Sequence, residues 1–198
     1  LEGIRVIDLS TAYSAPIATM QLADFGADVI KIENTGKGDG ARTWNPFVNG
    51  ESLGYMYANR NKRSITLNLK TEEGKKALFE LVKTADVVVE NFRPGVTKKL
   101  GIDYEVMKQI KPDIIMASLS GYGQTGPYAK KGAYSNLAEA QSGLMYLTGW
   151  PNGLPTGSGV AFGDSIAGMF LVQGIMYALF HHERTGEGQY IDVAMVDS

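Results

Sequence analysis

Short apolar runs alternate along the chain with longer amphipathic stretches. Ile4–Leu9 reads as a buried strand, a helix follows from about Pro16 to Phe25, and Asp28–Glu33 reads as a second strand. The same alternation returns later, with further strands expected at Ser64–Leu69, Asp86–Glu90, Asp113–Leu119 and Gln189–Ala194. Strands and helices that alternate at these lengths predict an α/β fold built on a doubly wound, mostly parallel sheet.

The helical pattern predicts five further segments. They are Thr71–Thr84 with Thr71 as N-cap, Pro94–Leu100, Tyr104–Ile110, a helix from about Tyr134 to Leu147, and an apolar helix from Asp164. Two long stretches, Asn34–Arg63 and Ser120–Ala133, carry no regular pattern. Long irregular segments in a compact domain are usually functional, so we expect both to lie near the carboxyl ends of strands, where open α/β sheets bind ligands.

One segment is long and apolar enough to imitate a membrane span. Gly159–Phe180 contains no Lys or Arg, but it does contain Asp164, which is costly within a bilayer. We therefore expect a helix buried on all sides in a soluble domain, and no membrane. The first residues, LEGIRVIDLS, do not resemble a signal peptide, so we expect a cytoplasmic protein. Because the chain starts without Met and stops at VDS, we also expect a longer protein.

Composition and charge remove several classes of function. Of 198 residues, 19 are Lys or Arg and 21 are Asp or Glu, so a basic surface for nucleic acid is not expected. The absence of cysteine excludes thiol chemistry and Cys-ligated metals, and two adjacent histidines, His181 and His182, do not supply the usual zinc site or Ser-His-Asp triad. We expect no metal site. The turn STAYSAP after the first strand lacks the glycine fingerprint of nicotinamide cofactor binding.

The segment Gly163-Asp164-Ser165, at the start of the apolar helix, has two interpretations. Asp is a favoured N-cap, so Asp164 could serve the helix alone. The helix dipole and the free N–H groups could equally keep the Asp164 carboxylate ionised, and such a group can act as a covalent nucleophile. Glycines at 163 and 168 would then leave room for a substrate. The residues alone leave both interpretations open.

Three pairs of cations stand beside the predicted ligand loops. Each pair alone is typical of a solvated surface, but together they fit a ligand that carries several phosphates, such as coenzyme A (CoA). The pairs are Lys62-Arg63, Lys98-Lys99 and Lys130-Lys131.

Six ordered sequence blocks resemble family III coenzyme A transferases, the group that includes formyl-CoA transferase, carnitine CoA-transferase and the α-methylacyl-CoA racemases. The resemblance covers the whole chain and matches the N-terminal part of that family. The blocks are LADFGADVIKIE, NRNKRSITLNLK, ADVVVENFRPG, SGYGQTGP, GDSIAGM and RTGEGQYIDVAM.

The resemblance implies a Rossmann-like, CoA-binding large domain over residues 1–198, a smaller second domain mostly beyond residue 198, and an interlocked homodimer. It implies an enzyme of the class that transfers sulfur-containing groups, moving CoA between an acyl-CoA and a free carboxylic acid. Asp164 stands at the family's nucleophile, which forms an aspartyl anhydride and then an aspartyl-CoA thioester. CoA and acyl-CoA would be substrates, and no permanently bound cofactor is implied.

The resemblance also places the CoA contacts. Asn34 stands where some transferases have a CoA-contacting Arg, and Tyr13 replaces a Gln of formyl-CoA transferase, which argues against formate or oxalate specificity. The positions that match the family's CoA-binding segments are Tyr13, Ser14, Asn34, Leu67, Asn68, Leu69, Lys70, Asn91, Phe92, Arg93, Lys99 and Tyr134.

Two alternatives remain open. An α-methylacyl-CoA racemase or epimerase would use a His and an Asp as its acid/base pair, and the matching stretch here, Gly132-Ala133-Tyr134-Ser135, contains neither. The other alternative is a catalytically inactive module that binds CoA.

Overall fold

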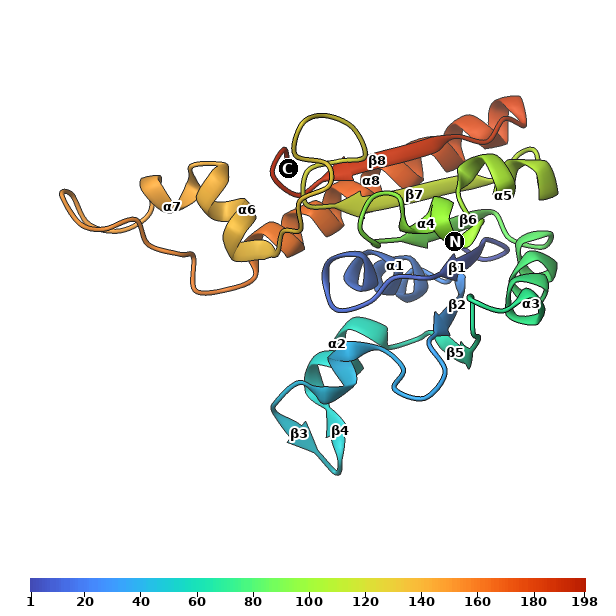
Figure 1. Ribbon diagram of the computed structural model, residues 1–198, viewed down its shortest axis with the longest axis horizontal. Coiled ribbons are helices and arrows are strands. Elements are labelled where there is room, and N and C mark those ends of the chain that lie inside the picture. Colours follow the sequence, from blue (N-terminus) through green and yellow to red (C-terminus); the bar gives the residue numbers. More distant parts are fainter.

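A six-stranded sheet forms the centre of the computed structural model, which describes residues 1–198 (Figure 1). All neighbouring strands of this sheet are parallel, in the order β5-β2-β1-β6-β7-β8. Long runs of β-branched residues suit such a sheet because both of its faces are covered. The predicted α/β class is therefore confirmed. The strands are β1 (Arg5–Asp8), β2 (Asp28–Glu33), β5 (Arg63–Thr66), β6 (Val87–Glu90), β7 (Ile115–Ser120) and β8 (Tyr190–Ala194).

The strand order reverses between β1 and β6. β1 pairs with β2 on one side, where Val6 faces Val29, and with β6 on the other, where Val6 faces Val87. Chain connections on the two sides of such a point leave toward opposite faces of the sheet, which opens a crevice at the carboxyl ends of the strands. The sheet topology therefore sets the position of a ligand site before any side chain is considered.

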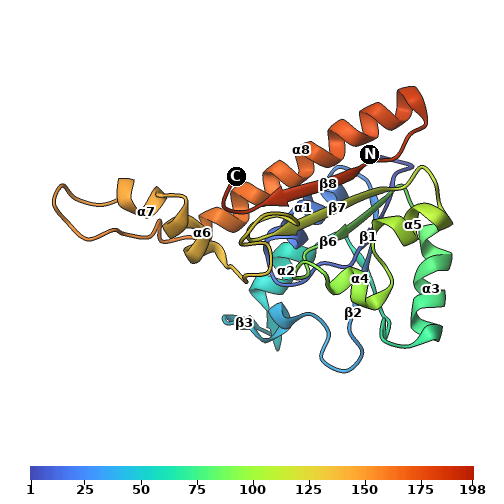
Figure 2. The same cartoon turned by 45° about the horizontal axis from the view of Figure 1, so that its top comes forward.

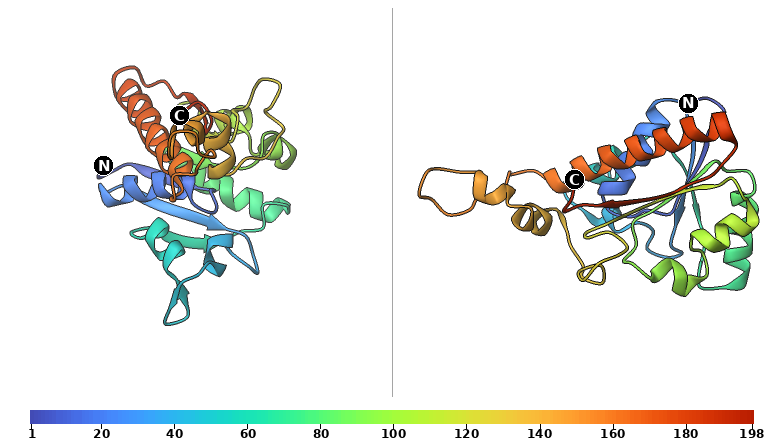
Figure 3. Two further views of the ribbon diagram at one scale, coloured as in Figure 1. Left: turned by 90° about the vertical axis from the view of Figure 1, so that its left-hand side faces the viewer. Right: turned by 90° about the horizontal axis from the view of Figure 1, so that it is seen from above.

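Two layers of helices cover the sheet (Figure 3). Helices α1 (Ser14–Asp24) and α8 (Phe162–Thr185) pack on one face, where the core includes Ala18, Leu22 and Leu171. Helices α3 (Glu72–Val82) and α5 (Tyr104–Ile110) cover the opposite face. The short helix α4 (Val96–Leu100) follows β6. As predicted, Thr71 caps α3, its side chain accepting a hydrogen bond from the Gly74 N–H at 3.1 Å.

The apolar helix α8 is not buried on all sides. Its buried residues face α1 and the sheet, but only 33% of its most apolar stretch is buried. Tyr177 is 70% exposed, and the other exposed apolar side chains of this helix include Met169, Phe170 and Phe180. By length and composition α8 could cross a membrane. Here it packs against α1 and the sheet along one side, so the expectation of complete burial is wrong for this chain.

The stretch from Asn34 to Arg63, predicted to be irregular, contains regular structure. It holds a short 3-10 helix η1 (Gly40–Thr43), a hairpin of β3 (Phe47–Val48) and β4 (Glu51–Ser52), and helix α2 (Leu53–Asn59). The Ser52 side chain caps α2 by accepting a hydrogen bond from the Tyr55 N–H. These elements are too short to produce a periodic hydrophobic pattern, which explains why the pattern missed them.

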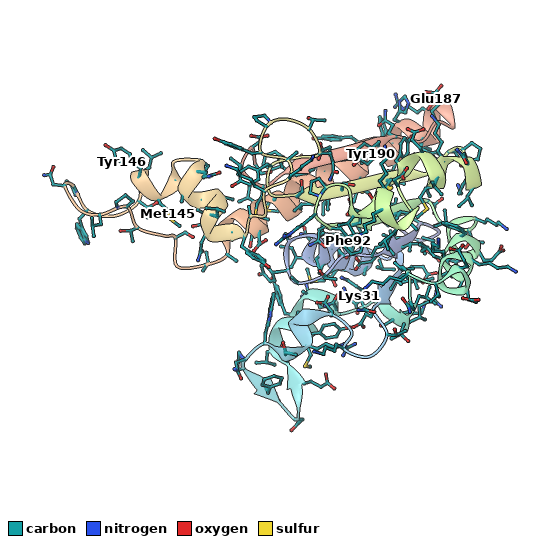
Figure 4. All side chains as sticks on the ribbon, viewed as in Figure 1. Lys31, Phe92, Met145, Tyr146, Glu187 and Tyr190 are labelled. Atoms are coloured by element: carbon teal, nitrogen blue, oxygen red, sulfur yellow. The ribbon has the colours of Figure 1, made fainter.

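The helix expected from Tyr134 to Leu147 is broken. Gly143 adopts a left-handed conformation (φ 86°) and separates α6 (Ser135–Gln141) from α7 (Leu144–Leu147). Residues 142–160, here called the arm, project beyond the sheet (Figure 2). Figure 4 shows Met145 and Tyr146 on this arm, far from Phe92 and Lys31 in the body of the protein.

Candidate active site

Two loops meet where the strand order reverses, and a pair of hydrogen bonds ties them together. The Asn91 side chain follows β6, and its Oδ1 accepts from the Thr11 N–H at 2.9 Å while its Nδ2 donates to the Thr11 carbonyl at 2.8 Å. The β1–α1 and β6–α4 loops are thus held side by side at the carboxyl ends of the two central strands. This is the position at which doubly wound sheets bind ligands.

A cavity of about 460 Å³ opens beside these loops. Asp164 lines it from the first turn of α8, and Trp44 contributes from the connection after η1. Seven of the predicted site residues line this cavity: Tyr13, Ser14, Asn91, Phe92, Arg93, Tyr134 and Asp164.

A second cavity of about 380 Å³ lies on the other side of Phe92 and Thr11, which line both cavities. Its wall includes the chain just after β5, which ends at Thr66 rather than at the expected Leu69. The predicted residues that line it are Asn34, Leu67, Asn68, Leu69, Lys70, Phe92 and Lys99. Every residue predicted for the site therefore lines one of two adjoining cavities.

The backbone of Phe92, which lines both cavities, is fixed by buried polar groups of the sheet. The buried Glu90 carboxylate accepts a hydrogen bond from the Phe92 N–H at 2.7 Å. Burial raises the pKa of Glu90 to about 7, although hydrogen bonds from Ser118 and Phe92 work in the opposite direction. The hydroxyl of Tyr190 on β8 donates to the Ser118 hydroxyl at 3.0 Å. A polar chain across three strands thus anchors the Phe92 backbone.

Buried charges shape the β1–α1 loop that lines both cavities. The Asp39 Oδ1 accepts from the Ala12 N–H at 2.9 Å, and Ala12 has a left-handed backbone (φ 69°) that a residue with a Cβ seldom adopts. Nζ of Lys31 lies 2.8 Å from Asp39 Oδ2, close enough for an ion pair but without hydrogen-bond alignment. Nζ of Lys62 donates to Asp8 Oδ2 at 2.9 Å. These two ion pairs, both buried, fix the loop from beneath.

Asp164 is not the N-cap of α8. The helix begins at Phe162, its N-cap is Ala161, and Asp164 lies within the first turn. The two glycines expected to make room for substrate instead make room for neighbouring backbone. A Cβ at Gly163 would lie 3.2 Å from the Ser135 carbonyl oxygen, and one at Gly168 would lie 2.7 Å from the Ser14 carbonyl oxygen. These close contacts fix Asp164 against α1 and α6.

The environment of Asp164 makes its carboxylate more basic. Burial raises the pKa of Asp164 above its usual value, contact with the Ser14 hydroxyl lowers it, and the negative charge of Glu139 raises it further. Desolvation therefore opposes the stabilisation of the ionised form that was expected from the helix dipole. A carboxylate of raised basicity in a partly buried position is a better nucleophile.

The three cation pairs have different roles. Lys62 and Arg63 do not face the cavities, because Lys62 is buried in its ion pair with Asp8 and Arg63 pairs with Asp28. Lys99 lines the second cavity and Lys131 lines the first. The phosphate interpretation is thus wrong for the first pair, and geometry allows it for one residue of each of the other two. His182 contacts the Asp113 carboxylate at 3.0 Å.

Sequence reasoning missed several residues of the first cavity. Trp44 lies in the stretch Asn34–Arg63, which has no regular pattern, and Lys131 was noted only as one of a cation pair. Leu137 and Met195 were not assigned to the site. Thr11, which lines both cavities, follows the first strand directly. That position relative to a central strand was the one signal that could have singled it out.

Comparison with known proteins identifies the family. The model of CoA-transferase family III matches residues 1–198. An acetyl-CoA:oxalate CoA-transferase of Acetobacter aceti is 48% identical over 198 residues, which are 99% of this chain and 51% of that protein. The succinyl-CoA:glutarate CoA-transferase of Homo sapiens is 45% identical over 199 residues, which are 100% of this chain and 45% of that protein. The chain spans about half the length of the curated relatives it matches.

A solved structure shares the fold described above. The crystal structure of a CAIB/BAIF family protein from Brucella suis aligns with a TM-score of 0.95 and 43% identity, covering 99% of this chain and 53% of that one. The family match along every residue, the identity to curated CoA-transferases and this shared architecture together make the chain a member of CoA-transferase family III.

Proposed function

We propose that the protein is a CoA-transferase that moves CoA between an acyl-CoA and a free carboxylic acid, with Asp164 as covalent nucleophile. The observation that carries the proposal is the place of Asp164, a partly buried carboxylate of raised pKa that faces a cavity at the reversal point of the sheet. The names of the relatives, which act on acetyl-CoA with oxalate and on succinyl-CoA with glutarate, support the same class of reaction.

The proposed reaction uses one carboxylate throughout. The Asp164 carboxylate attacks the thioester carbonyl, the C–S bond breaks, and CoA thiolate leaves an aspartyl acyl anhydride. The thiolate then attacks the aspartyl carbonyl, releases the donor acid and forms an aspartyl-CoA thioester. The acceptor carboxylate displaces CoA to give a second anhydride, and the thiolate attacks its acceptor carbonyl to restore Asp164. No proton is consumed, and the cavity must exclude water from the anhydrides.

The two cavities suggest how CoA would lie. Lys70 and Lys99 line the second cavity, where cations suit the phosphates of the nucleotide. The pantetheine arm would then pass Phe92, the wall shared by both cavities, and carry the thioester into the first cavity toward Asp164. Arg93 and Lys131 line that first cavity and would attract the carboxylates of donor and acceptor.

We also propose a homodimer. Large apolar side chains are exposed on the arm, where Tyr146, Leu147, Trp150 and Leu154 are each at least 82% exposed. Exposed apolar surface of this extent is typical of a surface that another chain or segment covers.

Peptide mass spectrometry on the protein tests the covalent mechanism. The protein is incubated with a panel of acyl-CoAs, trapped with hydroxylamine or borohydride, and digested. We expect a mass change confined to the peptide that contains Asp164. Asp164→Asn should abolish the adduct and the transfer while CoA binding remains, whereas Asp197→Asn, at an exposed acid, should change neither.

Retained turnover in Asp164→Asn would exclude Asp164 as the nucleophile. CoA binding without any adduct in the wild-type protein would instead favour an inactive binding module. Exchange of the α-proton into deuterated water would favour a racemase.

A further inference from the structure

A second carboxylate lies buried behind Asp164. Glu139 on α6 is only 2% exposed, and its carboxylate accepts four hydrogen bonds. Its Oε1 accepts from the Ser135 hydroxyl at 2.8 Å and, over a longer 3.5 Å, from the Gly163 N–H. Its Oε2 accepts from the hydroxyl of Ser158 at 2.8 Å and from the N–H of the same residue at 3.3 Å. Burial would raise the pKa of Glu139, but these bonds outweigh burial and lower it.

These contacts replace a cap that α8 lacks. The N-cap residue Ala161 has no side chain that can accept a hydrogen bond from the first turn. The Gly163 N–H instead points to Glu139, and the Asp164 N–H points to the Ser135 hydroxyl at 3.4 Å. Because Ser135 gives its own proton to Glu139, its oxygen is free to accept from Asp164. The pair on α6 thus serves two of the four free N–H groups of the helix.

The same contacts join three separate segments. Glu139 connects α6 to Ser158 near the end of the arm and to the first turn of α8. Gly163 lets this turn approach Ser135 so closely that a Cβ at position 163 would lie 3.2 Å from the Ser135 carbonyl oxygen. Together the contacts fix the turn from which the Asp164 side chain reaches the cavity.

We propose that Glu139 is a positioning residue, which caps α8 from the neighbouring helix α6 and thereby holds the Asp164 carboxylate in its direction toward the cavity. The inference rests on the proposed role of Asp164 as nucleophile. A negative charge behind the first turn also interacts favourably with the positive end of the helix dipole. The same charge disfavours the ionised form of Asp164 and so increases its basicity.

The pH profile of Glu139→Gln tests the electrostatic part. Glutamine keeps the shape and an acceptor oxygen but removes the charge, so we expect the acid limb of kcat/KM to move to lower pH. The other charged and titratable groups around Asp164 line the same cavity and stay unchanged; they are Tyr13, Arg93, Lys131 and Tyr134. Glu183→Gln, at an exposed position on α8, is the matched control and should leave the limb in place. A limb that does not move in Glu139→Gln overturns this part.

Ser135→Ala and Glu139→Ala test the positioning part. Each should speed hydrogen exchange at the Asp164 amide, and kcat should fall by roughly 10- to 100-fold while the Kd for CoA stays unchanged, as expected when a reacting group is displaced. Unchanged exchange and unchanged kcat in both variants would overturn the inference. If Glu139→Ala fails to fold, Ser135→Ala decides, because it removes the hydroxyl that links the Asp164 amide to Glu139 and leaves the Glu139 carboxylate in place.

Asp164→Asn separates the two proposals. Turnover that survives in Asp164→Asn refutes the proposed function, while the exchange measurement still reports on the cap. If Asp164→Asn is inactive while the Glu139 and Ser135 variants keep the wild-type kcat and amide exchange, only the positioning role is refuted.

Discussion

Replacing Lys62 by methionine removes a buried positive charge while keeping most of the volume of the side chain. In the native protein all three protons of the Lys62 ammonium group have acceptors, namely Asp8 Oδ2, the Pro16 carbonyl and Asn59 Oδ1, each at 2.9 Å. Lys62 and Asp8 have side-chain exposures of 1% and 0%. The substitution therefore leaves a carboxylate in the interior without its closest cation.

The size of the effect follows from that burial. Breaking a buried ion pair by removing one partner costs about 3–5 kcal/mol, because the remaining charge is uncompensated. Asp8 keeps its hydrogen bonds from the Ser10 N–H and the Thr19 hydroxyl, so the lower half of that range is the better expectation. For a domain of this size a loss of about 3–4 kcal/mol corresponds to a fall in Tm of roughly 6–16 °C.

Urea unfolding at pH 7 measures the change in free energy. The control is Lys83→Met. Lys83 pairs with Glu80 on the surface, so its loss should lower the free energy of unfolding by less than about 0.5 kcal/mol. The double variant Asp8→Asn/Lys62→Met removes both charges, so it should be more stable than Lys62→Met alone. Equal loss in Lys62→Met and Lys83→Met, or no recovery in the double variant, would refute the assignment of an uncompensated buried charge.

Three further outcomes are expected. Lys99→Ala should weaken the affinity for CoA, measured by calorimetry, more than it lowers kcat. The reason is that Lys99 lines the second cavity and not the cavity that contains Asp164. An unaltered affinity would exclude Lys99 from the CoA site. Gly168→Ala should lower the free energy of unfolding, measured in urea, by about 1–3 kcal/mol, because the new Cβ would lie 2.7 Å from the Ser14 carbonyl oxygen. Gly40→Ala is the control, since a Cβ at position 40 would meet nothing within 4 Å. Burial disfavours the ionised form of Asp8, but the charges of Lys62 and Lys31 lower the pKa of Asp8 to about 2. About 2 kcal/mol of the free energy of unfolding should therefore be lost as the pH falls from about 4 to 2. A free energy of unfolding that does not change over this pH range contradicts the prediction.

The sequence predicted the alternation of strands and helices well because a parallel sheet covered on both faces requires continuous apolar strands. Ile4–Leu9 and Asp28–Glu33 correspond to β1 and β2 with little change in bounds. It failed where elements are too short for the hydrophobic pattern to repeat, as in α2 and the β3–β4 hairpin. It also missed the break at Gly143, since a single left-handed residue does not interrupt the apolar spacing around it.

The residues of the candidate site could be predicted for a different reason. The residues that line the two cavities were expected from the resemblance to a family, and periodicity alone would have named few of them. Trp44 and Leu137 escaped because neither stands at a position that the resemblance assigned to CoA binding. The basicity of Asp164 could not be foreseen, because it depends on burial and on Glu139, a residue 25 positions away that only the packing of α6 against α8 brings close.

The order of strands in the sheet has a consequence for folding during synthesis. β1, β2 and β5 are adjacent in the sheet and lie within the first 66 residues, so half of the sheet can pair early. The face that α1 shares with α8 cannot be fully covered until residues 162–185 have been made, and β8, the edge strand, comes later still. Such long-range closure is slow and leaves apolar surface exposed meanwhile. A nascent chain stalled before α8 would therefore present an uncovered half-core to chaperones or to other nascent chains.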